Sequence, residues 1–141
     1  MRVVVTGGRN FGQLTGSVLD KTPEEVNTIY QQQKLVFKVL DELNTGQEGP
    51  IKVLATGGAS GADHTAHSWA VDNLVQTASF PVTAKKWQYV GPKAGPIRNG
   101  IMLDTVRPDV VVAFPGGKGT ADCKRQAVSK GYRVMEVDSE V

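Results

Sequence analysis

Three runs of apolar, mostly β-branched residues each end at a pair of adjacent glycines. The runs are MRVVVT before Gly7-Gly8, IKVLAT before Gly57-Gly58, and DVVVAF before Pro115-Gly116-Gly117. Their hydrophobicity is continuous rather than alternating, which is typical of strands buried on both faces of a parallel sheet. Two further runs, SFPVTAKK (79–86) and YRVMEV (132–137), predict two more strands.

Helical patterns lie between these runs. The longest begins at Thr22-Pro23-Glu24-Glu25, which combines an N-cap, a proline in the first turn and a capping-box glutamate, and Gly46 is its expected stop. Its apolar stripe packs on the core or forms a contact between subunits, which leaves a homodimer or higher oligomer open. The other predicted helices are Ala62–Leu74, Pro96–Val106 and Thr120–Lys130.

The alternation of strands and helices predicts one fold class. We expect an α/β fold: a three-layer, Rossmann-like domain with a mainly parallel five-stranded sheet and right-handed crossovers. A length of 141 residues corresponds to about one domain. We therefore expect a single domain over 1–141, with a long helical insertion at about 22–46.

Composition narrows the function classes. The single cysteine, Cys123, excludes an internal disulfide framework and fits a reducing cytosol, so we expect a cytoplasmic protein. No apolar stretch approaches the ~20 residues of a membrane span, so no membrane association is expected. A net charge of +2 is too small to predict electrostatic binding to nucleic acid.

The glycine pairs point to one shared site. In a doubly wound fold the carboxyl ends of the strands open on one edge of the sheet, and ligands bind there, near the point where the strand order reverses. Each glycine turn can present backbone N–H groups to an anion, and two of them lead into a helix N-terminus, whose dipole attracts negative charge. The chain has no Walker lysine motif and no GxGxxG fingerprint, which disfavours ATPase and dehydrogenase functions.

Four motifs carry a resemblance to a known family. They are VVVTGGRNF, TGGASGADHTAHSWA, AKKWQYVGPKAGPIRNGIML and VVAFPGGKGTAD, in that order along the chain. Together they resemble the YspA-like branch of the SLOG superfamily, which is named after the SMF/DprA proteins and the LOG nucleotide hydrolases. The resemblance implies a Rossmann-like sheet that binds nucleotides or their derivatives, in a superfamily whose members include sensors and binders as well as enzymes.

The LOG enzymes offer a more specific comparison. Arg98 and Met102 in RNGIM resemble their Arg-Lys-x-x-Met element, and Pro115–Thr120 resembles the start of their Pro-Gly-Gly-x-Gly-Thr-x-x-Glu motif. Cys123 stands at the position of the LOG glutamate, and a thiol cannot replace a carboxylate in cleaving an N-glycosidic bond. The nearest carboxylate is Asp122, which either acts as a catalytic residue together with Arg98 or only complements the helix dipole.

Other candidates also have two interpretations. Asp63 accepts a hydrogen bond from a ligand hydroxyl, or it closes a capping box that begins at Ser60. Asn10 contacts the ligand or stabilises its turn. The aromatic residues Trp87 and Tyr89, together with their neighbouring lysines, stack a base, or they anchor a loop on the sheet edge.

The two histidines are not expected to hold a metal, and the cysteine is not expected to be reactive. His64 and His67 lie three residues apart without a third ligand, so we expect no metal site and no cofactor. Cys123 has no identified base partner, so a small buried side chain is the expected role.

Three functions remain open. The first is binding of a nucleotide or nucleotide-derived small molecule, and the second is LOG-like N-glycosidase activity on nucleoside 5′-monophosphates through Asp122. The third is single-stranded nucleic-acid binding, because GGASGADHTAHSWA also resembles a DNA-binding element of the DprA proteins, although the charge disfavours it. The residues expected to bind the ligand are Gly7, Gly8, Arg9, Asn10, Gly57, Gly58, Ser60, Asp63, Arg98, Asn99, Pro115, Gly116, Gly117, Gly119 and Thr120.

Overall fold

The structure is a computed structural model in which residues 1–14 and 16–138 are described. Five strands form one sheet, in the order β3-β2-β1-β4-β5, and every neighbouring pair is parallel. The strands are β1 (Arg2–Thr6), β2 (Val53–Thr56), β3 (Gln76–Ser79), β4 (Val110–Ala113) and β5 (Val134–Glu136). The helices are α1 (Pro23–Thr45), α2 (Ala62–Asp72), α3 (Ala84–Val90), α4 (Ala94–Val106) and α5 (Lys118–Ser129), with short 3₁₀ turns at Val18–Asp20 and Gly91–Lys93.

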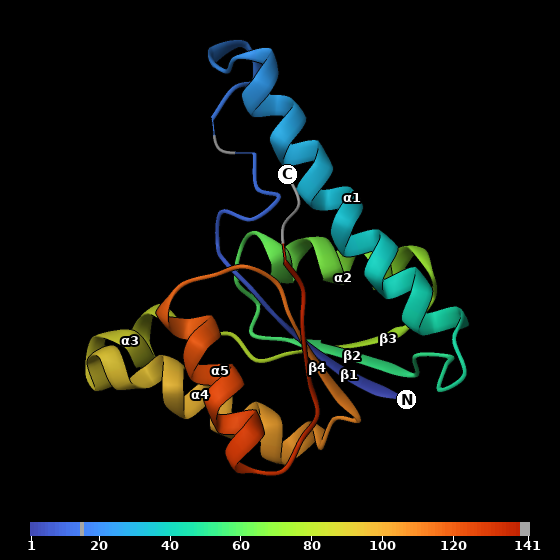
Figure 1. The fold of residues 1–141 in the computed structure, drawn as a ribbon. Helices are drawn as coiled ribbons and strands as arrows, with labels where there is room; N and C mark the ends of the chain where they lie inside the picture. The colour runs from blue at the N-terminus through green and yellow to red at the C-terminus, as the bar shows by residue number, and fades with distance from the viewer. Residues whose placement is uncertain (15, 139–141) are drawn as a thin grey trace.

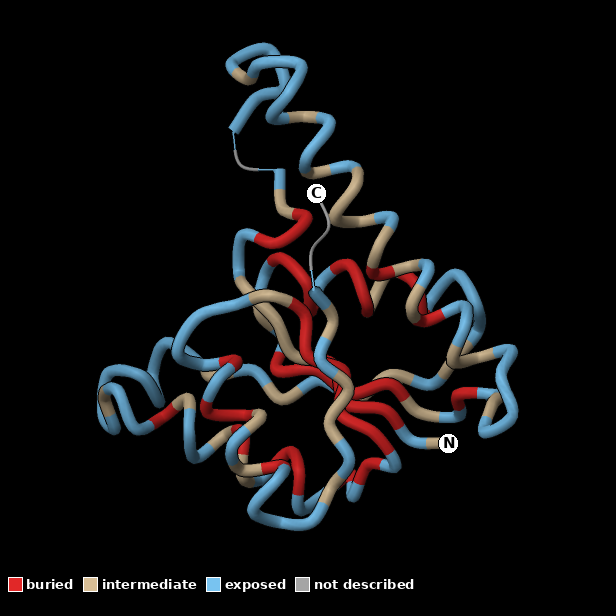
Figure 2. The backbone as a smooth tube through the Cα atoms, viewed as in Figure 1, coloured by how far each residue is buried: buried red, intermediate tan, exposed pale blue. Residues whose placement is uncertain are grey.

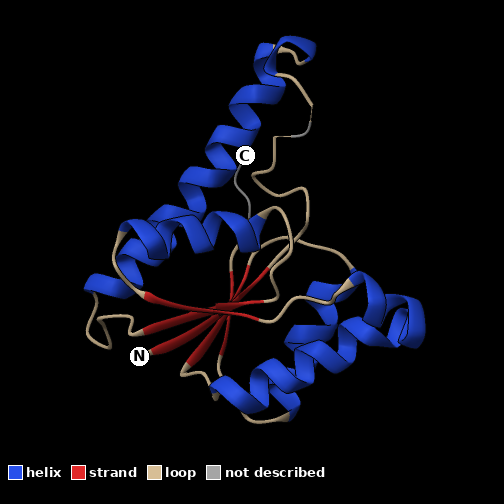
Figure 3. Cartoon of the chain, turned by 180° about the vertical axis from the view of Figure 1, so that it is seen from behind, coloured by secondary structure: helices blue, strands red, loops and turns tan. Residues whose placement is uncertain are grey.

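Helices cover both faces of the sheet, so the predicted three-layer Rossmann-like fold is confirmed (Figure 3). Neighbouring residues of β1 point to opposite faces. Val3 and Val5 pack against α1 and α2, whereas Val4 packs against α4 and α5. Buried residues accordingly follow the strands and the sides of the helices that face them (Figure 2).

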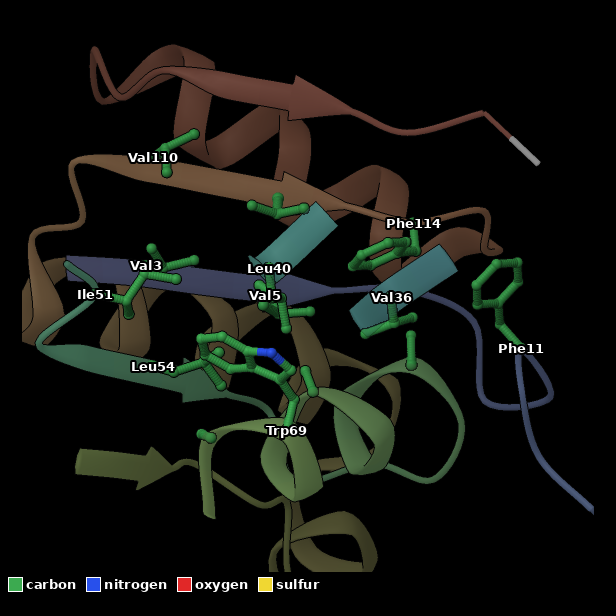
Figure 4. Packing of buried hydrophobic residues seen from close by; sticks show 14 residues of the cluster. Val3, Val5, Phe11, Val36, Leu40, Ile51, Leu54, Trp69, Val110 and Phe114 are labelled. Atoms are coloured by element: carbon green, nitrogen blue, oxygen red, sulfur yellow. The ribbon is translucent and has the colours of Figure 1, made fainter. Parts of the chain in front are cut away.

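The long helix α1 matches the predicted helix and contributes to the core. Thr22 caps it, with its Oγ1 accepting a hydrogen bond from the N–H of Glu25 at 3.1 Å. Val36 and Leu40 of its second half are fully buried beside Trp69 of α2 (Figure 4). The other half of α1 extends beyond the sheet (Figure 1).

The prediction of a strand at 79–86 is wrong, because only Ser79 of this range belongs to a strand. The strand β3 ends at Ser79, and Pro81, which has no N–H to donate, follows two residues later. Thr83 then caps α3, with its Oγ1 accepting from the N–H of Lys86 at 3.1 Å. A capping threonine two residues after the proline therefore turns AKKWQYV into a helix rather than an extended run.

The strand order reverses between β1 and β4, which places the topological switch point between the loops that follow these two strands. The two loops are joined directly, because the N–H of Gly8 donates to the carbonyl of Pro115 at 2.9 Å. A Cβ on Gly116 would lie 2.7 Å from the nitrogen of Gly8, so the loops approach more closely than a side chain permits. The fold thus brings the first and third glycine turns together.

Candidate functional site

A cavity of about 890 Å³ opens at the carboxyl edge of the sheet. This volume lies within the ~300–1,000 Å³ that small-molecule sites usually have. All three glycine turns line it, as the sequence predicts. The cavity is lined by these residues that were expected to bind a ligand: Gly7, Gly8, Arg9, Gly57, Gly58, Ser60, Asp63, Arg98, Asn99, Gly117, Gly119 and Thr120.

Four expected residues do not line the cavity: Asn10, Pro115, Gly116 and Asp122. Asn10 is exposed and its carbonyl accepts from the N–H of Gln13 at 3.2 Å, so it belongs to the turn after β1. The carbonyl of Pro115 is bonded to Gly8, as described above. Asn10 and Pro115 therefore shape the loops around the cavity.

Several lining residues were not predicted. Lys118 occupies the variable position of the PGGxGT motif, so motif comparison alone could not identify it. Pro81, Val82 and Ala84 were missed because residues 79–86 were expected to form a strand, and Gly95 was missed because it precedes the helix predicted from Pro96. Pro81 and the capping residue Thr83 are the features of the sequence that could have indicated the end of the strand and the start of a helix.

Two of the glycine turns use their N–H groups inside the protein. The N–H of Gly8 donates to Pro115, and that of Gly58 donates to the Oγ1 of Thr56 at 3.1 Å. The expectation that every glycine pair presents these groups to an anion is therefore wrong for both residues. The first two turns instead form parts of the cavity wall that consist of backbone rather than side chains.

The third turn keeps its N–H groups available. Helix α5 begins at Lys118, and its N-cap, Gly117, supplies no side-chain hydrogen bond. The first N–H groups of a helix have no intrahelical partner, and the helix dipole adds positive potential there. The first turn of α5, with Gly119 and Thr120, is therefore the best anion-binding element of the cavity. Thr120 lies within this turn, and the N-cap of the helix is Gly117.

Arg98 is held in place on α4 by three hydrogen bonds. Its Nη1 donates to the carbonyls of Gly57 at 2.6 Å and Phe80 at 3.1 Å, and its Nε donates to the Oδ1 of Asn99 at 2.9 Å. A Cβ on Gly57 would lie 2.5 Å from this Nη1, so only glycine lets the guanidinium lie flat against the turn. Burial lowers the pKa of Arg98 from its ordinary value, but a guanidinium stays charged in proteins.

Asp122 is buried beneath the cavity wall and its carboxylate is fully engaged. Its Oδ2 accepts from the Nδ2 of Asn99 at 3.0 Å and from the Nε2 of Gln126 at 2.8 Å, and its Oδ1 accepts from Arg125 at 2.9 Å. Because Asn99 in turn accepts from Arg98, Asp122 orients the cavity arginine through an intervening amide. Asp122 does not line the cavity.

Asp63 lies at the second position of α2 and faces the cavity. The expected capping box does not form, because the N-cap of α2 is Gly61 and the Oγ of Ser60 donates to the carbonyl of Arg9 at 3.0 Å. Gly61 has a φ of +77°, and a Cβ there would collide with the carbonyl of Gly8, so the residue must be glycine. Burial raises the pKa of Asp63 from 3.8 to about 6, and the N–H of Ala59, the charge of Arg98 and the nearby N–H of Gly57 oppose that rise.

Charged side chains of both signs line the cavity. Among its described lining residues, Arg9, Arg98 and Lys118 are cationic and Asp63 is the one acid. Arg9 and Lys118 are exposed at the mouth, whereas Arg98 is half-buried. The balance favours an anionic guest that also carries a group able to pair with a carboxylate.

The apolar side of the cavity consists of Pro81, Val82, Trp87 and Met102. Trp87 of α3 is 49% exposed, and its ring is available for stacking. Tyr89, which the sequence groups with Trp87, is 79% exposed and does not line the cavity.

The remaining candidates lie outside the cavity. His64 and His67 of α2 do not line it. Cys123 is fully buried, and burial raises the pKa of its thiol to about 11, which leaves it protonated and unreactive. The expected role of Cys123 as a small buried side chain is confirmed.

The fold and the cavity define a class: a Rossmann-like α/β domain with glycine-rich turns around a cleft at the topological switch point. Within that class, the chain belongs to the YspA, cpYpsA-related SLOG family, whose model matches residues 1–87. The matched region runs from β1 into α3 and includes two of the three glycine turns.

A structural comparison adds one neighbour. The chain is similar to DNA processing protein A (DprA) from Streptococcus pneumoniae, with 19% identity and a TM-score of 0.43. The alignment covers 95% of this chain and 58% of the DprA chain. No curated protein sequence matches the chain significantly. Within the described part of the chain, no helix has both the length and the apolar character needed to cross a membrane.

Proposed function

We propose that the chain binds a nucleotide or nucleotide-derived ligand in the cavity at the carboxyl edge of the sheet. The observation that carries this proposal is that three glycine turns far apart in sequence, together with Arg98, line one cavity of about 890 Å³. The need for glycine in a tight turn explains each glycine pair when it is considered alone. It does not explain why cationic side chains and a free helix N-terminus meet at the same place.

The ligand phosphate is assigned to the first turn of α5. The N–H groups there lack intrahelical partners, and Lys118 and Arg98 supply positive charge beside them. The Nη2 of Arg98 makes no hydrogen bond to the described residues, whereas its Nη1 and Nε are used. It is therefore the guanidinium nitrogen that is available to a phosphate oxygen.

The base is assigned to the apolar side of the cavity. Trp87 offers a ring for stacking, and Pro81 and Val82 extend the same apolar surface. A phosphate at α5 and a base at α3 would require the ligand to span the cavity, as a mononucleotide or a larger derivative can.

The geometry favours binding over hydrolysis through Asp122. That carboxylate is bonded to Asn99, Arg125 and Gln126 and does not line the cavity. A glycosidase carboxylate must reach the sugar or an attacking water.

Isothermal titration calorimetry with AMP, GMP, CMP, UMP, ADP-ribose and NAD tests the proposal, with adenosine as the probe that lacks phosphate. We expect at least one phosphate-bearing probe to bind and adenosine to bind at least tenfold more weakly than AMP. The variant Arg98→Gln should weaken binding by roughly tenfold or more, because hydrogen bonds to charged groups are worth about 1.5–3 kcal/mol. The matched control is Arg107→Gln at the end of the same helix.

Two results would contradict the proposal. One is no binding of any of the six nucleotides at millimolar concentration. The other is tight binding of a single-stranded oligonucleotide with a steep salt dependence, which would make nucleic-acid binding the better explanation. Incubation with the same nucleotides, followed by detection of free base, tests hydrolysis directly.

A further inference from the structure

Asp63 lines the cavity, and one of its two carboxylate oxygens has no hydrogen-bond partner among the described residues. The residue is 5% exposed, and its Oδ2 accepts from the N–H of Ala59 at 3.3 Å. Its Oδ1 is buried and makes no hydrogen bond to any residue that the structure describes. Because buried polar atoms are nearly always paired, this atom requires an explanation.

A purely local role accounts for only one of the two oxygens. An acidic residue in the first turn of a helix complements the dipole and can bond to the preceding loop, as the Oδ2 of Asp63 does. Such a role would be equally well served by a carboxylate that is exposed to solvent. It does not explain why the second oxygen is buried at a cavity wall.

The chemistry of the missing partner follows from the surroundings. Because the pKa of Asp63 is about 6, the carboxylate is mainly ionised at neutral pH, and it then accepts hydrogen bonds without donating any. Arg98 lies close enough for its charge to act on Asp63, and Arg9 and Lys118 line the same cavity. These three cations disfavour a cationic donor, so the partner is a neutral O–H or N–H group.

In a nucleotide, the neutral donors nearest to the phosphate are the hydroxyl groups of the ribose. Arg98 and Asp63 both approach the turn at Gly57, so a phosphate held near Arg98 brings the adjoining sugar toward Asp63. The donors on a base lie farther away, toward Trp87 on the other side of the cavity.

We propose that the Oδ1 of Asp63 accepts a hydrogen bond from a ribose hydroxyl of the ligand, so that the cavity selects nucleotides with an intact ribose over deoxy analogues that lack this hydroxyl. This inference rests on the proposed nucleotide-binding function and specifies the substrate class. A site built to bind a hydroxyl rejects an analogue that lacks it, because the buried polar atom then stays unpaired.

The test compares AMP, 2′-deoxy-AMP and 3′-deoxy-AMP by calorimetry at pH 7.5. The wild type should bind at least one deoxy analogue tenfold or more weakly than AMP. The variant Asp63→Ala should bind AMP about as weakly as the wild type binds that analogue, while its affinity for the analogue changes less than threefold. Asp72→Asn, at the exposed end of the same helix, is the control and should leave all three affinities unchanged.

The outcomes separate the two proposals. If the wild type binds AMP and both deoxy analogues within twofold of one another, the inference about Asp63 is wrong while nucleotide binding stands. An equal loss of affinity for all three probes in Asp63→Ala also overturns it, because that is the result of a structural role. If none of the probe nucleotides named above binds, both proposals fail. The comparison on the wild type holds even if Asp63→Ala does not fold.

Discussion

Replacing Asp63 by asparagine removes a carboxylate whose pKa burial raises from 3.8 to about 6. In the folded state this group binds its proton more tightly than in the unfolded state. Between pH 4 and 6 the folded protein therefore carries more protons, and its stability falls as the pH rises through this range. The loss is complete above about pH 7 and absent below the unfolded pKa.

The size of the effect follows from the two pKa values. At about 1.36 kcal/mol per pKa unit, the difference between 3.8 and about 6 corresponds to roughly 3 kcal/mol of lost stability at neutral pH. The asparagine variant does not titrate and escapes this loss. Its new amide N–H₂ lacks an acceptor, which costs about 1–3 kcal/mol at every pH. Only the change with pH therefore tests the reasoning.

Urea unfolding followed by circular dichroism at pH 4, 5, 6 and 7.5 measures this change. The free energy of unfolding of Asp63→Asn, minus that of the wild type, should increase by about 2–3 kcal/mol from pH 4 to pH 7.5. Asp72→Asn is the matched control, since that aspartate is exposed on the same helix. A difference that stays constant within about 0.5 kcal/mol would refute the claim that burial raises the pKa of Asp63.

Two further substitutions probe the cavity and the core. Gly57→Ala should displace the guanidinium of Arg98, which lies 2.5 Å from the added Cβ, and weaken AMP binding by roughly tenfold in calorimetry. Asp72→Asn, which lies outside the cavity, should change AMP affinity less than threefold, and equal effects of Gly57→Ala and Asp72→Asn would contradict this prediction. Trp69→Phe removes the 2.8 Å hydrogen bond that its Nε1 donates to Asp41 of α1, and should lower the free energy of unfolding by about 1–3 kcal/mol in urea. An unchanged unfolding midpoint would show that this bond does not fasten α1 to α2.

The fold followed from the sequence because its signals are local and agree with one another. Continuous apolar runs predicted buried parallel strands, and Thr22-Pro23 predicted where α1 begins. The segment after Ser79 was predicted wrongly because Val82 and Phe80 suggest a strand, whereas Pro81 and the cap at Thr83 decide the structure.

The cavity lies at the sheet edge that the sequence predicts, but several contacts around it differ from the expectation. The convergence of the glycine turns follows from parallel topology alone. Which N–H groups stay free depends on contacts between distant loops, such as Gly8 with Pro115, which no local pattern reveals. The burial of Asp122 under Asn99 likewise depends on how α4 packs against α5.

The central claim is that the glycine turns and Arg98 bind one phosphate-bearing ligand, and an NMR titration of ¹⁵N-labelled protein with AMP tests it most directly. We predict that the largest amide shifts fall on Gly119 and Thr120 at the start of α5, with smaller shifts at Gly58 and at the side chain of Arg98. Adenosine at the same concentration should leave the amides of α5 unchanged. Shifts confined to residues outside the cavity, or equal shifts at α5 with adenosine, would contradict the account.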